Sequence, residues 1–201
     1  GWVSEEGNLY ASLLLNEPAP PQTIGQLPLV ASVALHRAVV AAMPEVGPRL
    51  LIKWPNDLLL DGKKLSGMLL EAATFGGKQA VVIGCGINCA HHPAQAMYPS
   101  TSLAESVAPL EPETLFLHVA RQMDEALQLW NAGEGFRDIR ESWLARCAGL
   151  GQPITARFPD HEITGTFEDI DADGHLVLRK PQGVQRISAA DIFFGESDQV
   201  R

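Results

Sequence analysis

The sequence predicts an α+β fold, in which a mixed, largely antiparallel sheet with helical cover is followed by a small β-barrel. Three observations lead to this prediction. Short turn-forming pairs separate four consecutive strand signals between residues 49 and 87, which indicates an antiparallel meander. Segments with apolar residues at helical spacing lie on both sides of this meander. After residue 150 the pattern changes to short alternating strands, so we expect domains at residues 1–149 and 150–201.

The individual elements follow from local patterns. Residues 2–15 alternate and then run apolar, which predicts a strand or hairpin that ends in a buried strand. Between Thr23 and Met43 the apolar spacing predicts a helix, and Pro28 should lie in its first turns or bend it. The further strands of the first domain are expected at residues 49–54, 57–60, 64–73 and 79–87, and its further helices at residues 112–131 and 136–147. In the second domain the strand signals are ITARF, ITGTFEDI, HLVLRK and VQRIS.

Composition narrows the class of protein. A chain of 201 residues that is 46% hydrophobic can bury a sizeable core, and no apolar run approaches the roughly 20 residues that cross a bilayer. The formal charge of −9, without a block of cationic residues, argues against a nucleic acid partner. Cys85, Cys89 and Cys147 are an odd number, so reduced thiols are expected. These features predict a cytoplasmic protein whose partner is neither a membrane nor a nucleic acid.

One short stretch is unusually charged for a pair of apolar strands. It reads KWPNDLLLDGKKLSGMLLEA and runs from Lys53 to Ala72. The pairs Pro55-Asn56 and Asp61-Gly62 are turn formers within it. Lys64 follows Asp57 on the return strand of the resulting hairpin, a position from which both side chains could converge on one site. The stretch is therefore the first candidate for a functional site.

The chain resembles the biotin protein ligases in this stretch and in its neighbours. The segments KWPND at 53–57, KLSGMLLE at 64–71 and GCGIN at 84–88 stand in that family's order and spacing. WVSEEGNLYASLLL at 2–15 and TSLAE at 101–105 extend the similarity, so that nearly the whole chain is covered. The resemblance implies a class II synthetase-like catalytic domain followed by an SH3-like β-barrel.

The resemblance also implies an activity and its partners. Members of the family use ATP to convert biotin to biotinyl-adenylate with release of pyrophosphate, and then transfer biotin to a lysine of a carboxylase carrier domain. ATP and magnesium are thus the expected cofactors, biotin is the expected substrate, and the biotin carboxyl-carrier domain is the expected partner. An exposed edge of the predicted sheet would also permit a homodimer.

The motif positions that match the family suggest a role for each residue. By resemblance, Lys64 is the catalytic lysine that bridges carboxylate and phosphate, where a fixed cation would neutralise developing charge. Asp57 would orient the acceptor amine or accept its proton, and would help to hold magnesium. Trp2 would stack on the adenine, and Asn56 and Asn88 would contact the nucleotide. The biotin pocket would be lined by Gly67, Leu69, Gly84, Gly86 and Ile87.

Simpler interpretations exist for the same charged stretch. Lys53 and Lys63 are expected to be solvated hairpin lysines, because an isolated charge beside a turn is usually solvated. Asp57 could be a turn residue that hydrogen-bonds its own backbone. Trp54 is expected to pack in the core, and Glu71 could be a buried partner for a basic residue.

Two other clusters resemble metal sites only superficially. The run from Asp169 to Gly174 matches the first half of a calcium-binding loop, but Lys180 occupies the position that requires glutamate, so a hairpin turn is expected. The cysteines and histidines between residues 85 and 92 do not have the spacing of a closed zinc site.

The resemblance is incomplete at the N-terminus. A glycine- and arginine-rich loop of the form GRGRxGR, preceded by a strand and a helix, would stand upstream of Trp2 in the family, whereas the chain begins at Gly1. Three hypotheses follow: the larger part of a biotin ligase, a catalytically inactive module that binds an adenylate or a carrier domain, and a related lipoate or acyl ligase. The intact motifs KWPND and GCGIN favour the first.

Overall fold

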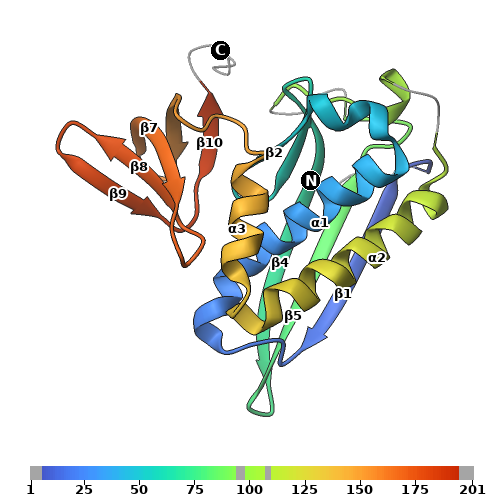
Figure 1. The fold of residues 1–201 in the computed structure, drawn as a ribbon, viewed down its shortest axis with the longest axis horizontal. Coiled ribbons are helices and arrows are strands. Elements are labelled where there is room, and N and C mark those ends of the chain that lie inside the picture. The colour runs from blue at the N-terminus through green and yellow to red at the C-terminus, as the bar shows by residue number, and fades with distance from the viewer. Residues whose placement is uncertain (1–5, 94–97, 107–109, 195–201) are drawn as a thin grey trace.

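The structure is a computed structural model, and it describes residues 6–93, 98–106 and 110–194. Two five-stranded antiparallel sheets lie next to each other, with three helices packed on the first (Figure 1). The first sheet has the strand order β1-β5-β4-β3-β2. Its strands are β1 (Leu9–Asn16), β2 (Leu50–Lys53), β3 (Asp57–Leu60), β4 (Lys63–Phe75) and β5 (Lys78–Ile87).

The predicted meander is confirmed as β2-β3-β4-β5, and β1 adds to it along β5. Every strand pair is antiparallel, and two isolated bridges, Ile52–Cys147 and Lys64–Ser100, are parallel. The β3–β4 turn uses Asp61 and Gly62 at φ values of 51° and 78°. Both residues thus adopt the left-handed backbone that short hairpin turns require, as the Asp-Gly pair predicted.

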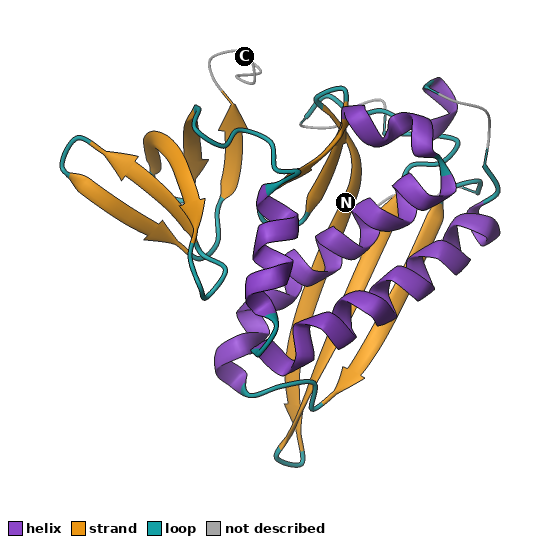
Figure 2. Ribbon diagram, viewed as in Figure 1, coloured by secondary structure: helices purple, strands orange, loops and turns teal. Residues whose placement is uncertain are grey.

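Three helices cover one face of this sheet: α1 (Leu27–Ala42), α2 (Pro112–Trp130) and α3 (Phe136–Leu144) (Figure 2). Pro28 lies in the first turn of α1, where its missing N–H costs no hydrogen bond, and a 3₁₀ turn at Pro21–Gln26 precedes it. The helix α1 is buried along most of its length because it packs against the sheet, α2 and α3.

The segment Pro21–Ala42 is long and apolar enough to cross a membrane by length and composition alone, but 67% of its apolar window is buried within the protein. The expectation that no apolar run approaches the length needed to cross a bilayer is therefore wrong for this segment. The burial gives the reason for the composition, since the central helix of a core must be apolar on nearly all sides.

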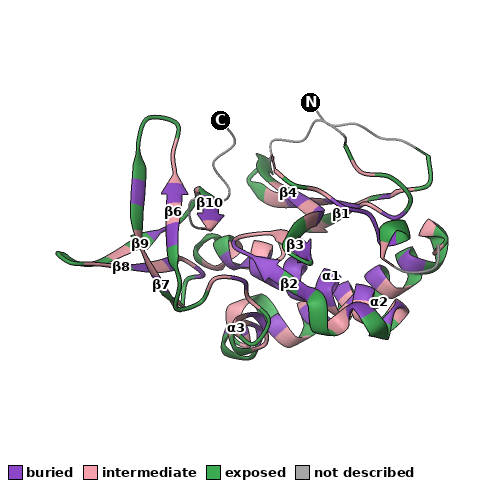
Figure 3. Cartoon of the chain, turned by 90° about the horizontal axis from the view of Figure 1, so that it is seen from above, coloured by how far each residue is buried: buried purple, intermediate pink, exposed green. Residues whose placement is uncertain are grey.

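The register gives the first sheet two different faces. On the helix-covered face lie Leu9, Met68, Ile83 and Ile87, all of them buried. On the opposite face Gly67 pairs with Gly86, and Leu69 pairs with Gly84. Among the described residues no helix covers this second face, which we call the open face (Figure 3). The glycines on the open face have no side chain, so a ligand can approach the backbone closely there.

The second sheet has the strand order β10-β6-β7-β8-β9. Its strands are β6 (Pro153–Arg157), β7 (Glu162–Ile170), β8 (Leu176–Lys180), β9 (Gly183–Ile187) and β10 (Asp191–Phe194). The first four correspond to the expected strands, whereas β10 was not expected. Among the described residues no pairing joins β9 to β10, so the structure shows a sheet where a closed barrel was expected.

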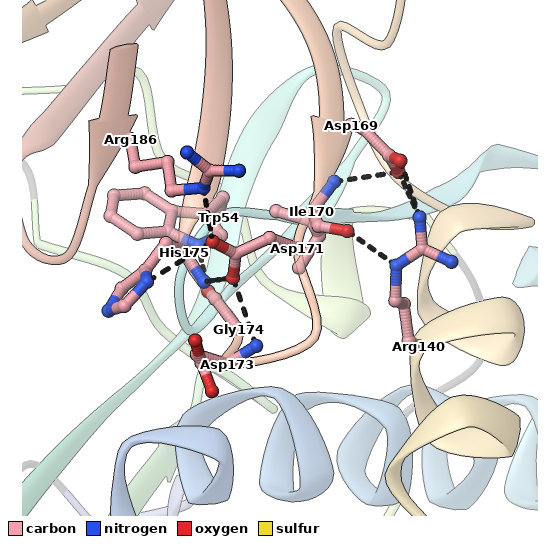
Figure 4. A network of polar contacts seen from close by, with 9 residues as sticks. All are labelled: Trp54, Arg140, Asp169, Ile170, Asp171, Asp173, Gly174, His175 and Arg186. Carbon is pink, nitrogen blue, oxygen red and sulfur yellow. Dashed lines mark hydrogen bonds and ion pairs between the residues drawn. The ribbon is translucent and has the colours of Figure 1, made fainter.

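Polar contacts connect the two sheets (Figure 4). Trp54, buried as expected, donates from Nε1 to the carbonyl oxygen of Gly174 at 3.2 Å. Arg140 on α3 donates to the carbonyl oxygen of Ile170 and to the carboxylate of Asp169. The second sheet is therefore fixed directly to the turn that precedes Asp57.

The segment that resembles half of a calcium loop is a hairpin turn, as expected. One carboxylate oxygen of Asp171 accepts hydrogen bonds from the backbone N–H groups of Asp173 and His175 at 3.0 and 2.9 Å. Its other oxygen faces the side chains of His175 and Arg186. These contacts show that Asp171 stabilises the backbone of the β7–β8 turn.

Candidate functional site

The open face contains a hollow between β1, β4 and β5. A cavity of about 310 Å³ lies there, and its lining includes Tyr10, Ser12, Leu69, Glu71 and Gly84. A Cβ atom at Gly84 would stand 3.6 Å from the carbonyl oxygen of Leu69, so the floor of the hollow is backbone. An apolar wall with a few polar groups, over exposed backbone, is the usual composition of a small-molecule site.

Lys64 and Asp57 meet at one end of this face. Lys64 Nζ lies 2.7 Å from Asp57 Oδ2, and the two side chains are 35% and 16% exposed. A Cβ atom at Gly67 would lie 3.2 Å from Lys64 Cε and 3.3 Å from Asp57 Oδ1. Gly67 therefore provides the space that the ion pair occupies, and the convergence expected from the hairpin is present.

The local backbone explains why the pair forms. A bulge in the β3–β4 ladder at Leu58 and Leu59 shifts the register, so that Ser66 pairs with Leu58 and Lys64 pairs with Leu59. Bulges re-aim side chains and occur often beside active sites. Asn56 donates from Nδ2 to the carbonyl oxygen of Met68 at 2.7 Å, which ties the turn before Asp57 to β4.

A loop runs alongside Lys64 and supports its backbone. Lys64 N–H donates to the carbonyl oxygen of Pro99 at 2.8 Å, and Thr101 N–H donates to the carbonyl oxygen of Lys64 at 3.0 Å. Asn88 donates from Nδ2 to the carbonyl oxygen of Thr101 at 2.9 Å. The side chain of Asn88 therefore supports this loop, and the loop holds the lysine in place.

The TSLAE segment, residues 101–105, also stabilises the loop that contains Pro99 and Thr101. Glu105 accepts a hydrogen bond from Thr101 Oγ1 at 2.8 Å and contacts His92 Nε2 at 2.9 Å. The Thr101 hydroxyl, followed by His92, lowers the pKa of the Glu105 carboxyl. His92 Nδ1 in turn lies 3.0 Å from Ser100 Oγ, the residue that bridges Lys64. The function of TSLAE in the structure is thus to order the loop beside Lys64.

For three other charged residues of the stretch 53–72, the expectations came from general rules about charged side chains and not from the family motifs. Lys63 is exposed, as expected. Lys53 was expected to be solvated and is instead buried, with Nζ 4.5 Å from the centroid of the Tyr98 ring. Glu71 was considered as a buried partner for a basic residue and is instead exposed on the open face. The alternation of β4 places Glu71 on the same face as Leu69, away from the core.

The second sheet contributes to the site, which the sequence did not indicate. Phe194 of β10, Tyr98, Lys53, Asp57 and Lys64 line a small cavity of about 20 Å³. The only sequence signal for β10 was the short apolar run DIFF near the end of the chain. A run of four residues is too short to distinguish a strand from a loop, and it does not indicate a position beside Lys53.

Not all residues of the expected site come together in the structure. Trp2 lies outside the described residues. Ile87 is buried on the helix-covered face, so its side chain does not reach the cavity of the open face. Gly67, Gly84, Gly86 and Leu69 all lie on the open face. The GCGIN motif thus supplies glycines to this face, while its isoleucine fills the core.

The cysteines do not form a metal site in the described part of the chain. Cys85 and Cys89 are free and buried, and burial raises the pKa of both thiols. Burial likewise raises the pKa of Cys147 to about 11. Such thiols stay protonated at neutral pH and are poor metal ligands. All three cysteines are free thiols and none forms a disulfide, as the odd number predicted.

Magnesium would have to be held by few protein groups. Asp57 offers one carboxylate beside Lys64, which fits the way this ion is usually bound, by one or two carboxylates together with substrate phosphates. Among the described residues the one cluster of three metal-ligating side chains, Asp171, Asp173 and His175, lies in the β7–β8 turn of the second sheet.

Comparison with known protein families gives two matches. Residues 1–88 match the model of the biotin/lipoate A/B protein ligase family, and residues 149–195 match the biotin protein ligase C terminal domain. The two matched segments correspond to the Lys64 region with the open face and to the second sheet. An α+β ligase with an appended β domain is the class that this fold and site define.

Comparison with individual proteins narrows this class. The chain is 43% identical over 206 residues to a biotin--[acetyl-CoA-carboxylase] ligase of Paracoccus denitrificans, with 96% of this chain and 83% of the relative covered. It is 31% identical to the bifunctional ligase/repressor BirA of Bacillus subtilis, covering 96% of this chain and 61% of that protein. The chain belongs to the biotin protein ligase family.

Solved structures agree in fold. The structure of biotin protein ligase from Aquifex aeolicus in complex with biotin and ATP superposes with a TM-score of 0.84, at 25% identity, over 96% of this chain and 82% of that chain. A Leishmania major biotin protein ligase in complex with biotinyl-5-AMP superposes with a TM-score of 0.61 at 22% identity, over 94% of this chain and 81% of that chain, and supports the fold alone.

Proposed function

We propose that the protein is an ATP-dependent biotin–carrier protein ligase whose chemistry takes place at the Lys64–Asp57 pair. The observation that carries this proposal is a paired cation and carboxylate at the end of a glycine-lined open face. Family membership supports the proposed substrates, namely biotin, ATP and the biotin carboxyl-carrier domain of a carboxylase. Magnesium is proposed at Asp57 together with the phosphates, where it would neutralise negative charge.

In the first step a carboxylate oxygen of biotin attacks the α-phosphorus of ATP. The bond from that phosphorus to the pyrophosphate oxygen breaks, and biotinyl-adenylate and pyrophosphate result. Both reactants are anions, so a fixed ammonium group between them stabilises the transition state. Lys64 can take this position because the Pro99–Thr101 loop orders its backbone and Asp57 orients its ammonium group.

In the second step the amine of an acceptor lysine attacks the biotinyl carbonyl carbon. The carbon–oxygen bond to AMP breaks, an amide forms, and the amine loses one proton. Asp57 is the proposed acceptor or orienting group for that proton, since its carboxylate is only 16% exposed and lies beside Lys64. The open face with Gly67, Gly84, Gly86 and Leu69 is the proposed binding site of the biotin chain. Asn56 and Asn88 are the proposed contacts of the nucleotide.

Biotin-dependent exchange of labelled pyrophosphate into ATP tests the first step. We expect exchange with the full-length protein and a loss of about 10²- to 10³-fold for Lys64→Ala, because removal of one donor to transition-state charge has that effect. Lys63→Ala is the matched control, since this neighbouring lysine is exposed. Binding of biotinyl-adenylate without any exchange would identify an inactive binding module, and exchange that depends on lipoate would identify a lipoate ligase.

The domain boundaries, the cellular location and the oligomeric state are also proposed. Residues 1–149 and 150–201 form the catalytic and C-terminal domains, in agreement with the change from α3 to β6 between Leu144 and Pro153. The free cysteines agree with a cytoplasmic location. The strand β1 stands at one edge of the first sheet and could support a homodimer.

A further inference from the structure

A second and larger cavity lies on the helix-covered side of the first sheet. Its volume is about 440 Å³, it opens to solvent, and it is bordered by α1, the C-terminal end of α3 and the strand β2. Its apolar lining consists of Val33, Val40, Ala41, Ile52 and Ala145. This volume lies in the range of small-molecule pockets, and neither Lys64 nor Asp57 belongs to the lining.

The charged lining of this cavity sets it apart from the rest of the protein. Seven of the nine arginines in the described part of the chain form an ion pair with a carboxylate: Arg49, Arg121, Arg137, Arg140, Arg157, Arg179 and Arg186. The other two, Arg37 and Arg146, both line this cavity. In a chain with a formal charge of −9, these two described arginines form no ion pair with a described carboxylate, although Glu125 lies close enough to Arg37 to interact with it electrostatically. Together they mark a local positive site.

Two further polar groups complete the lining. Ser142 accepts a hydrogen bond from Arg37 Nη2 at 3.0 Å, which orients that guanidinium group. His36 is buried and has Nε2 3.1 Å from the carbonyl oxygen of Leu50. Since a carbonyl only accepts, His36 Nε2 carries the proton. The polar groups thus arise from both α1 and α3, while the apolar wall lies between these helices and β2.

We propose that this cavity binds a small organic carboxylate, with the carboxylate group at Arg37 and Arg146 and a short apolar chain against Val33, Val40 and Ile52. Guanidinium groups bind carboxylates through paired, charge-assisted hydrogen bonds. The apolar wall favours a carbon chain over an inorganic anion. The bound molecule would lie against β2, the strand that leads into the turn with Asn56 and Asp57.

Hexanoate is a suitable probe, and titration calorimetry with the full-length protein measures its binding. We expect hexanoate to bind in the millimolar range or tighter, 1-hexanol to bind more weakly because it lacks the charge, and acetate to bind more weakly because each methylene lost costs about fourfold in affinity. Arg146→Gln, a change at an exposed side chain, should weaken hexanoate binding about tenfold, as expected for one charge-assisted hydrogen bond.

Two control variants distinguish binding in this cavity from a general charge effect and from binding on the open face. Arg137→Gln removes one exposed arginine from α3 and should leave hexanoate binding unchanged, which excludes an effect of net charge alone. Lys64→Ala should also leave it unchanged, which excludes binding on the open face. Equal binding of hexanoate by the parent and Arg146→Gln, or no binding by the parent at millimolar concentration, would overturn the proposal and leave the two arginines as solvated surface cations.

Discussion

At the scale of single residues, Gly67 sets the geometry of the proposed catalytic pair. A methyl group there would stand 3.3 Å from both Lys64 Nζ and Asp57 Oδ1, closer than nearly all such contacts in proteins. The backbone of Gly67 is not left-handed, so alanine meets no conformational strain. The substitution therefore acts on the ion pair directly.

We predict that Gly67→Ala lowers kcat of pyrophosphate exchange at least tenfold, because Lys64 must move away from the reacting oxygens. Gly84→Ala is the matched variant on the neighbouring strand, where the new methyl group has only an ordinary contact at 3.6 Å. It should raise KM for biotin and change kcat little, since it narrows the cavity without touching the pair. Steady-state kinetics of both variants measure the difference. If Gly67→Ala kept the parent kcat, the Lys64–Asp57 geometry would not be the catalytic one.

The residues of the site were predictable from the sequence to different degrees. Lys64 and Asp57 were identified from the motifs that resemble the biotin ligases, and the hairpin turn between them predicted that their side chains converge. Ile87 was placed in the pocket by motif, but the period-2 alternation of β5 directs it to the core. Lys53 was expected to be solvated, since no local pattern shows that Tyr98 and the distant Phe194 enclose it.

At the scale of elements, the helix α1 contains a titratable group within the core. Burial, followed by the positive charges of Arg146 and Arg37, lowers the pKa of His36 from its usual value of 6.5, against the opposing effect of the Leu50 carbonyl. The folded protein therefore holds His36 neutral at a pH where the unfolded chain is already protonated. More protons bind to the unfolded state in this range, so stability falls as the pH falls below about 6.5.

Urea unfolding at pH 7.5, 6.5 and 5.5 measures this effect. The parent should lose up to about 1.4 kcal/mol of unfolding free energy per pH unit from His36 below its unfolded pKa. His36→Gln keeps a donor for the Leu50 carbonyl and should show a smaller loss on acidification. His91→Gln, a change at an exposed histidine, should retain the parent slope. Equal slopes for the parent and His36→Gln would show that His36 does not titrate as described.

Most elements were predictable from the sequence, and the exceptions have a physical cause. The helices and the meander follow from strong periodicity and from turn residues such as Asp61 and Gly62. The pairing of β1 with β5 is not local, and neither is the addition of β10 to β6. A strand of four residues such as β10 carries too short a pattern to be distinguished from a loop.

At the scale of the whole molecule, the two sheets should unfold together. Arg140 on α3 connects them through Asp169 and Ile170, and Trp54 connects them through Gly174 (Figure 4). Arg140→Ala should lower the unfolding free energy by about 1–3 kcal/mol, since it removes charge-assisted bonds at a partly buried position. Arg137→Ala, on the same helix and paired only with its neighbour Asp138, should change it by less than about 0.5 kcal/mol.

Urea unfolding followed by tryptophan fluorescence and by circular dichroism tests this coupling. The parent should give one coincident transition with both methods. Arg140→Ala should shift its midpoint or separate the two transitions, whereas Arg137→Ala should overlay the parent. A parent protein that already unfolds in two well-separated steps would contradict direct coupling of the sheets.

The central claim is that this protein transfers biotin to a carrier domain through Lys64 and Asp57. The intact mass of a biotin carboxyl-carrier domain, incubated with biotin, ATP, magnesium and the full-length protein, tests it most directly. We predict that the acceptor gains the mass of one biotinyl group with the parent protein and with Lys63→Ala, and gains none with Lys64→Ala in the same time. An unmodified acceptor with the folded parent protein, or full modification with Lys64→Ala, would contradict the claim.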